Sequence, residues 1–150
     1  MKLAQALTER AELQRHLEQL SSRLMMNARV QEGEQPAEQP NVLLAQLEQT
    51  TAQLEALITR INLTNAAAQS EGESLTALLA RRDCLKQKVG ILRNFAAAAS
   101  ATVVRGTRTE IKIKSTVTVA ELQKQIDDLS RDLRQLEGRI QELNWTTELV

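Results

Sequence analysis

Apolar residues recur along most of the chain at alternating spacings of four and three, a pattern typical of helices that pack through a narrow apolar seam. The pattern is clearest near the C-terminus, in Leu122, Ile126, Leu129, Leu133, Leu136, Ile140 and Leu143. Thr118 and Glu121 just before it form a capping-box pattern. These positions predict a helix from about residue 119 to residue 144 that must pack against another helix.

The same pattern predicts a helix over about residues 2–30. This helix ends before the acidic, helix-breaking stretch "QEGEQPAEQP". A second helix is predicted over about residues 42–68, with Asn41 as its cap and a seam of Leu43, Leu47, Thr50, Leu54, Leu57 and Ile61. The polar break "QSEGES" follows, and a third helix is predicted over about residues 75–99, capped by Ser74 or Thr76.

The stretch "RGTRTEIKIKSTVTV" differs from the rest of the chain. Its β-branched residues alternate with basic ones, and Gly106 falls where a turn is needed. We therefore predict short strands at about residues 101–105 and 109–114, which form a β-hairpin at about 101–114. Because a lone hairpin is marginal in water, it needs support from the helices or from a second copy of itself.

The fold class predicted from these elements is mainly α, with four helices, three of them long, in an antiparallel coiled-coil-like bundle and a short β-hairpin between helices three and four. One helical domain is expected over residues 1–150. Phe95 and Trp145 are the only aromatic residues, so the core is aliphatic and suits a thin seam. Two long helical hairpins completed by a second subunit would show the same pattern, and the topology stays open.

The net charge is zero, but the charges are unevenly distributed. Residues 1–80 carry 6 basic and 10 acidic residues, residues 81–114 carry 9 and 2, and residues 115–150 carry 4 and 7. An acidic chain therefore contains a basic middle segment.

Several functional classes lack support in the sequence. Cys84 is the only cysteine and His16 the only histidine, so no disulfide framework, cysteine zinc site or di-iron site is expected. No glycine-rich phosphate loop is present. We predict no catalytic residue, metal site or cofactor. A cytoplasmic location is expected, because no signal peptide or membrane span is evident in the sequence.

Polar residues near the ends of predicted helices two and three form one candidate cluster. Its members are Asn62, Asn65, Arg82 and Asp83, together with Asn27 and Arg29. Buried polar groups need partners, so we expect a network. It is either a structural device that fixes helix register or a site for a small ligand or substrate.

The basic segment is the second candidate, as an interface or anion-binding arm formed by Arg105, Arg108, Lys112 and Lys114. Nucleic-acid binding is disfavoured by the lack of stacking aromatic residues and by the acidic flanks. Membrane-surface binding lacks the usual aromatic anchor. Self-assembly needs only the acidic surface of another copy, so we favour a homo-oligomer.

The segments "NARVQEGEQPAE", "INLTNAA", "LARRD", "EIKIKSTV" and "IQELNWTTEL" resemble those of the septicolysin-like family of small bacterial proteins, a group of unknown function. The resemblance implies a bacterial source and, through the family name, a cytolysin or virulence factor. No catalytic motif is carried over by it. The chain departs from a secreted lysin, since it shows no export signal and no long apolar insertion segment.

The sequence thus favours a non-enzymatic, self-assembling cytoplasmic protein whose basic hairpin forms part of the subunit interface. One alternative is a membrane-acting toxin or virulence factor, and only this alternative predicts membrane binding. The other alternative is an enzyme or small-ligand binder that uses the polar cluster at the ends of helices two and three.

Overall fold

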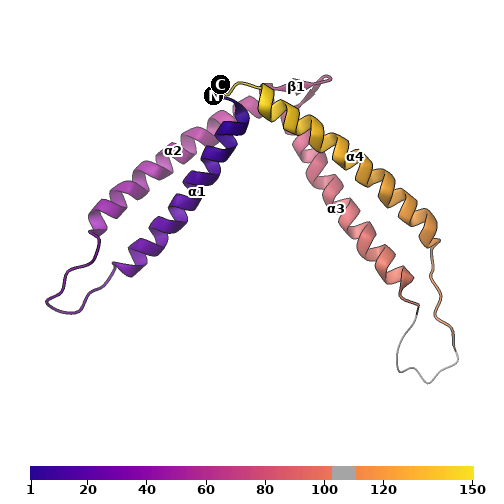
Figure 1. The fold of residues 1–150 in the computed structure, drawn as a ribbon, viewed down its shortest axis with the longest axis horizontal. Helices are drawn as coiled ribbons and strands as arrows, with labels where there is room; N and C mark the ends of the chain where they lie inside the picture. Colours follow the sequence, from indigo (N-terminus) through magenta and orange to yellow (C-terminus); the bar gives the residue numbers. More distant parts are fainter. Residues whose placement is uncertain (103–110) are drawn as a thin grey trace. The chain divides into compact units, whose positions relative to one another are not determined.

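A computed structural model of the protein describes residues 1–102 and 111–150 (Figure 1). The described residues are mainly α-helical, with four helices and one small antiparallel sheet of two strands. In chain order the elements are α1 (Leu3–Met26), α2 (Pro40–Ala67), β1 (Gln69–Ser70), β2 (Glu73–Ser74), α3 (Leu75–Ser100) and α4 (Val119–Thr146).

The four predicted helices are present, and two of their ends needed correction. Helix α1 ends at Met26 instead of near residue 30, because Asn27 caps it. Helix α2 begins at Pro40 with Gln39 as N-cap, so Asn41 lies inside the helix. Proline suits the first helical position because its fixed φ is already helical and the N–H it lacks would have no partner there. The predicted cap Ser74 is confirmed, since its hydroxyl accepts from the Ala77 N–H at 3.2 Å.

The two strands lie between α2 and α3, so the predicted position of the hairpin was wrong for the residues described. Residues 101–102 and 111–118 contain no strand, while residues 103–110, with Arg105 and Arg108, lie outside the described residues. The observed strands are joined by Glu71 and Gly72, both with positive φ, as a tight hairpin turn requires. The β-branched residues at 111–117 have the composition of a strand but no paired strand among the described residues.

The chain divides into two compact units, which are described separately. Unit 1 contains residues 1–69 and 143–150, and unit 2 contains residues 70–142. A single domain and a bundle of all four helices stay predictions.

Unit 1 is built on the antiparallel pair α1 and α2 (Figure 1). One face of each helix is buried in a single seam, which contains Leu3, Ala6, Leu20, Leu43, Thr50, Leu57, Ile61 and Thr64. The seam predicted for α2 is therefore confirmed, with Leu47 and Leu54 half-buried between its fully buried members. The remaining faces of both helices are exposed to solvent.

Unit 2 is built on α3 and most of α4. Val89 and Ala96 of α3 and Ile126 of α4 form a buried cluster, against which partly buried leucines from both helices pack. Two polar contacts also join the helices: Lys86 pairs with Glu137 at 3.2 Å, and Arg93 donates to the Ser130 hydroxyl at 3.2 Å. The predicted seam of α4 is confirmed by the burial of Ile126, Leu136 and Ile140.

The two units share a structural plan in their second helices. Arg60 of α2 and Arg139 of α4 each precede a buried isoleucine, Ile61 and Ile140. Arg60 Nε donates to the Val150 carbonyl oxygen at 2.7 Å, and Arg139 donates to the Ser70 carbonyl oxygen at 3.1 Å. In both units an arginine side chain thus binds the backbone of an extended segment.

The two ends of the chain form a second extended pair, in unit 1. Residues 1–3 run antiparallel to residues 147–149 and are joined to them by backbone hydrogen bonds of 3.0 and 2.8 Å. The Glu148 carboxylate accepts from Lys2 Nζ at 2.7 Å and from the N-terminal ammonium at 3.2 Å. The hydrogen bond from Lys2 lowers the pKa of Glu148 most, and the hydrogen bond from the N-terminal ammonium lowers it further.

Candidate functional site

Of the predicted polar cluster, four residues belong to unit 1, at opposite ends of its helix pair, and two belong to unit 2. Asn27 is buried just after the last residue of α1, and Arg29 is exposed two residues later. Asn62 and Asn65 lie near the C-terminal end of α2. Arg82 and Asp83 lie on α3 in unit 2, where they form an ion pair with each other at 2.9 Å. Asn27 donates to Arg23 and accepts from Glu38, and Arg82 donates to Asp83, so no hydrogen bond within unit 1 joins Asn27 to Asn62 or Asn65. A network between the two units stays a prediction.

Asn27 belongs instead to a clamp that closes the loop of unit 1. Its Nδ2 donates to the Arg23 carbonyl oxygen at 2.8 Å, and its Oδ1 accepts from the Glu38 N–H at 2.9 Å. The Arg23 guanidinium also donates to the Glu38 carboxylate through two nitrogens, and its Nε lies 3.0 Å from Glu38 Oε2. The hydrogen bond from Arg23 lowers the pKa of Glu38, and the same bond raises the pKa of Arg23. The clamp gives Asn27 a structural role.

Beyond the clamp, unit 1 presents an apolar and acidic surface, here called the acidic loop end. Its apolar members are Met25, Met26, Val30 and Val42. Its charged members are Glu32, Glu34 and Arg29, so acidic residues outnumber basic ones by two to one. Met25 and Met26 are 70% and 72% exposed. Neither Glu32 nor Glu34 forms an ion pair with another described residue. Exposed large apolar side chains that gather in one place mark interaction surfaces more often than scattered ones do.

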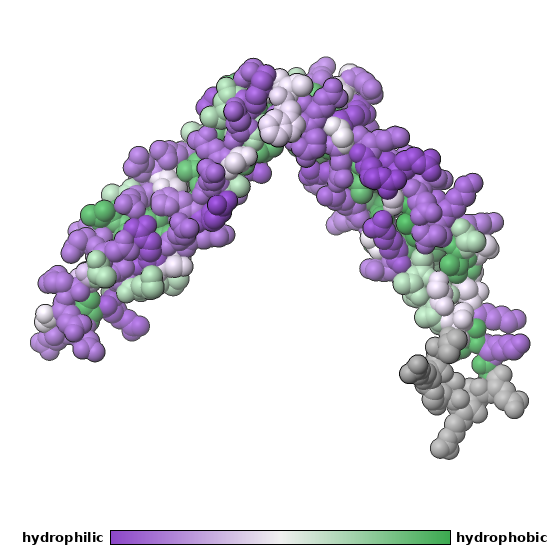
Figure 2. Space-filling view, viewed as in Figure 1, coloured by the Kyte–Doolittle hydropathy of each residue, from purple (hydrophilic) through white to green (hydrophobic). Residues whose placement is uncertain are grey.

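Unit 2 has a corresponding surface near its own loop, here called the basic loop end. Its apolar members are Ile91, Phe95, Ile111 and Ile113, and its basic members are Lys112 and Lys114. Ile91 is 68% exposed and Ile111 is 81% exposed. Figure 2 shows apolar surface on this face of unit 2 next to the residues drawn in grey. Of the predicted basic arm, Lys112 and Lys114 are exposed, whereas Arg105 and Arg108 lie outside the described residues.

The basic loop end contains a small hollow of about 250 Å³. Phe95, Ala98, Ala99 and Ile113 supply its apolar lining, and Lys114 lines it as well. Small alanine side chains in the last turns of α3 leave this space open beside the Phe95 ring. The hollow has room for one long apolar side chain, with a cation beside it.

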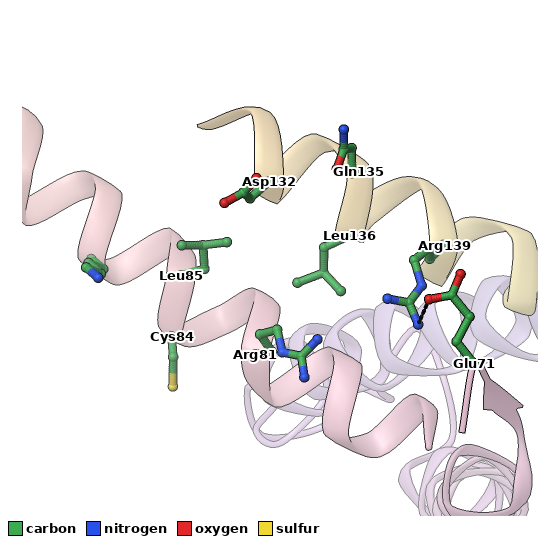
Figure 3. A pocket seen from close by; sticks show the side chains of 9 residues that line it. Glu71, Arg81, Cys84, Leu85, Asp132, Gln135, Leu136 and Arg139 are labelled. Carbon is green, nitrogen blue, oxygen red and sulfur yellow. Dashed lines mark ion pairs between the residues drawn. The ribbon is translucent and has the colours of Figure 1, made fainter. Parts of the chain in front are cut away.

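A larger hollow of about 680 Å³ lies along the groove between α3 and α4 (Figure 3). Leu85 and Leu136 face each other inside the groove, and the Cys84 sulfur points away from α4. Its charged lining residues are Glu71, Arg81, Lys88, Asp132 and Arg139. The volume is in the range of small-molecule pockets, and the lining combines apolar and charged groups.

Glu73 and Arg139 organise one end of this groove. The Glu73 carboxylate binds the Arg81 guanidinium through both oxygens and lies 3.8 Å from Arg139, which also pairs with Glu71 at 3.4 Å. The hydrogen bond from Arg81 lowers the pKa of Glu73, and the charges of Arg81 and Arg139 add to this effect. The Nε of Arg139 is buried and has no hydrogen-bond acceptor among the described residues. Sequence reasoning missed this cluster, although "QSEGES" held its two carboxylates.

The described residues contain no group of three or more His, Cys, Asp or Glu side chains that could hold a metal ion. None of the helices in the described ranges is long and apolar enough to cross a membrane.

The fold and these surfaces define a mainly α-helical protein built from paired long helices. Residues 10–149 match the model of DUF6847, a family of unknown function, and the chain belongs to that family. The chain is 40% identical to a functionally unknown conserved protein from Corynebacterium diphtheriae whose crystal structure is known. The match covers 100% of this chain and 99% of that one, with a TM-score of 0.93. No curated protein matches significantly.

The family match corrects the resemblance drawn from the sequence. The segments compared above with the septicolysin-like family lie within the residues that match DUF6847, and neither the family nor the structural neighbour points to a septicolysin. That identification was wrong. The expectation of a membrane-acting toxin depended on it and has no other support.

Proposed function

We propose that this protein is a non-enzymatic, self-associating helical protein, and that its function depends on contact between copies. The observation that carries the proposal is the pair of exposed apolar surfaces, one beside unpaired acidic residues and one beside lysines without an ion partner among the described residues.

The thin core of each unit supports this proposal. A pair of helices buries one seam only, and helices of this length in compact domains normally pack against several neighbours. Ile91 and Phe95 of α3 illustrate the consequence: both are large and apolar, and both are exposed. A second copy that covered such residues would remove apolar surface from water, which is the main favourable term in protein association.

The distribution of charge gives a second argument. Unit 1 carries 6 basic and 9 acidic residues, and unit 2 carries 13 basic and 10 acidic residues. Opposite surfaces on two copies attract each other, whereas the same unit on two copies is mutually repulsive. Such charge complementarity directs association and selects among the possible contacts.

The test is the molar mass of the protein in solution, measured by light scattering over a range of concentrations at low and high salt. The proposal expects a multiple of the chain mass of 16.7 kDa, with dissociation at high salt because exposed ion pairs are screened. A mass of 16.7 kDa at every concentration and salt level would contradict it.

A second candidate function is the binding of a small molecule in the larger hollow of unit 2. The observation that favours it is the lining of the hollow, which places the cations Arg81, Lys88 and Arg139 beside Leu85 and Leu136. Lys88 has no ion pair with a described residue, so a carboxylate with an apolar chain would pair with this lysine while covering the two leucines.

Hexanoate is a suitable probe for this second candidate, and hexylammonium is its control of opposite charge. Hexanoate is expected to raise the melting temperature of the wild type, because a ligand that binds only the folded state stabilises it. The effect should be lost in Lys88→Gln. If hexanoate and hexylammonium give equal shifts, the hollow does not recognise the carboxylate and the candidate fails.

A further inference from the structure

The two loop ends differ in charge but share exposed apolar residues, and each supplies what the other lacks. The acidic loop end presents two adjacent methionines that are largely exposed, next to Glu32 and Glu34. The basic loop end presents a hollow lined by Phe95 and Ile113, next to Lys112 and Lys114. We infer that the acidic loop end of one copy docks on the basic loop end of a second copy, with Met25 or Met26 in the hollow. This inference rests on the proposed function.

The side chains fit this contact chemically. Methionine is unbranched and flexible, so it fills irregular apolar spaces and contacts aromatic rings favourably through its sulfur. Phe95 supplies such a ring at the side of the hollow, and the neighbouring alanines leave room beside it. Burying the methionine of one copy against Phe95 of the other removes exposed apolar surface from both.

The charges fix which surfaces meet. Glu32 and Glu34 have no ion pair with a described residue, whereas Glu38 in the same loop is already held by Arg23. Two acidic loop ends brought together would place carboxylates against carboxylates, and two basic loop ends would place lysines against lysines. Only the contact between an acidic loop end and a basic loop end pairs opposite charges. Such a contact is heterologous, because the two copies use different surfaces to form it.

The inference is tested with two charge-reversal variants, studied by sedimentation at several concentrations. The first is Glu32→Lys with Glu34→Lys, and the second is Lys112→Glu with Lys114→Glu. Each variant alone should lose association, its dissociation constant rising about tenfold or more, because like charges now face each other. A mixture of the two variants should associate again, since each one then offers a surface of opposite charge to the other.

A third variant, Met25→Ser with Met26→Ser, tests the apolar part of the contact and should also weaken association. Two controls match these changes outside the loop ends. Glu9→Lys with Glu12→Lys makes the same change in net charge on the exposed face of α1, and Leu63→Ser removes an exposed leucine from α2. Both controls should associate like the wild type. Far-ultraviolet circular dichroism checks that every variant keeps its helices.

The outcomes separate this inference from the proposed function. A wild type that stays monomeric overturns both. A wild type that associates, with loop-end variants no weaker than their controls, overturns only the docking contact. Recovery of association in the mixture supports it, and loss in both variants without recovery in the mixture overturns the pairing of these two surfaces.

Discussion

Units 1 and 2 are built alike along their helices and differ where their loops close. In both, two long helices share one apolar seam, and an arginine of the second helix holds an extended segment through a backbone carbonyl. The loop of unit 1 is closed by the clamp of Asn27, Arg23 and Glu38. The described residues of the loop of unit 2 show no such clamp and carry lysines instead. The shared helices provide the scaffold, and the loops carry the differences that distinguish one surface from the other.

The largest expected effect tests whether the two seams support the fold equally. Ile61 and Ile140 are both 1% exposed and follow the equivalent arginines of α2 and α4. Replacing either by alanine should destabilise the protein by about 2–5 kcal/mol, because a buried side chain is lost and a cavity remains. Urea unfolding followed by circular dichroism measures this, with the isoleucine-to-valine variants as milder controls. A large loss at one position and none at the other would show that only one unit limits stability.

A smaller loss of stability is expected when the clamp is broken. The clamp is a feature of unit 1 that the described residues of the unit 2 loop lack. Asn27→Ala removes two hydrogen bonds and leaves the Glu38 N–H without its acceptor, at a cost of about 1–3 kcal/mol. Asn94→Ala on the exposed surface of α3 is the matched control and should change the free energy of unfolding little. Equal stability of the two variants in urea would mean that the clamp does not hold the loop.

Replacing two glycines by alanine distinguishes the effect of backbone strain on stability from the effect of helix propensity. Gly72 has a φ of 83° in the turn between β1 and β2, so Gly72→Ala should cost about 1 kcal/mol although no atom lies within 4 Å of the added methyl group. Gly138 lies inside α4 with equally open space, and Gly138→Ala should stabilise by up to about 1 kcal/mol. Opposite signs in thermal melting are expected, and the same sign for both would contradict the assigned turn.

The smallest expected effect is on how the melting temperature changes at acidic pH. Glu38 in unit 1 and Glu73 in unit 2 both have a pKa lowered by hydrogen bonds from an arginine. Their stabilising contribution is therefore complete above the ordinary value of 4.5 and is lost as the pH falls through the lower folded values. Melting temperatures between about pH 7 and about pH 3 should fall less steeply in Glu38→Gln and Glu73→Gln than in the wild type. If the melting temperatures of both variants fall with pH as steeply as that of the wild type, these ion pairs do not contribute to the loss of stability in acid.

The sequence predicted the helices because their signal is local and repeated. The seam of α4 needed only the alternating spacing of its apolar residues, and Ser74 was recognised as a cap from its position before α3. Strand position is harder, because a β-branched segment forms a strand only when a second segment pairs with it. The alternation at residues 111–114 gave no information on that partner, whereas Glu71 and Gly72 could make a tight turn without any β-branched residue nearby.

The candidate sites depended on contacts between residues far apart in sequence, and prediction was weaker there. Asn27 was predicted to belong to a polar cluster and is buried, but its partner Glu38 was not predicted, because their contact depends on how the loop folds back. The exposure of Met25 and Met26 could not be anticipated from the spacing of apolar residues, which does not say where a seam ends. The basic segment was found from charge alone, since charge can be counted without a structure.

The antiparallel pairing of residues 1–3 with residues 147–149 has a consequence for how the 150-residue chain can be rewired. Because its two ends are held side by side, a short glycine-rich linker can join them without stretching the backbone. New ends can then be opened between Glu71 and Gly72, at an exposed turn that contributes no residue to either seam. The resulting circular permutant would begin with α3 and finish with α2, which makes the order of the two helical hairpins along the chain interchangeable.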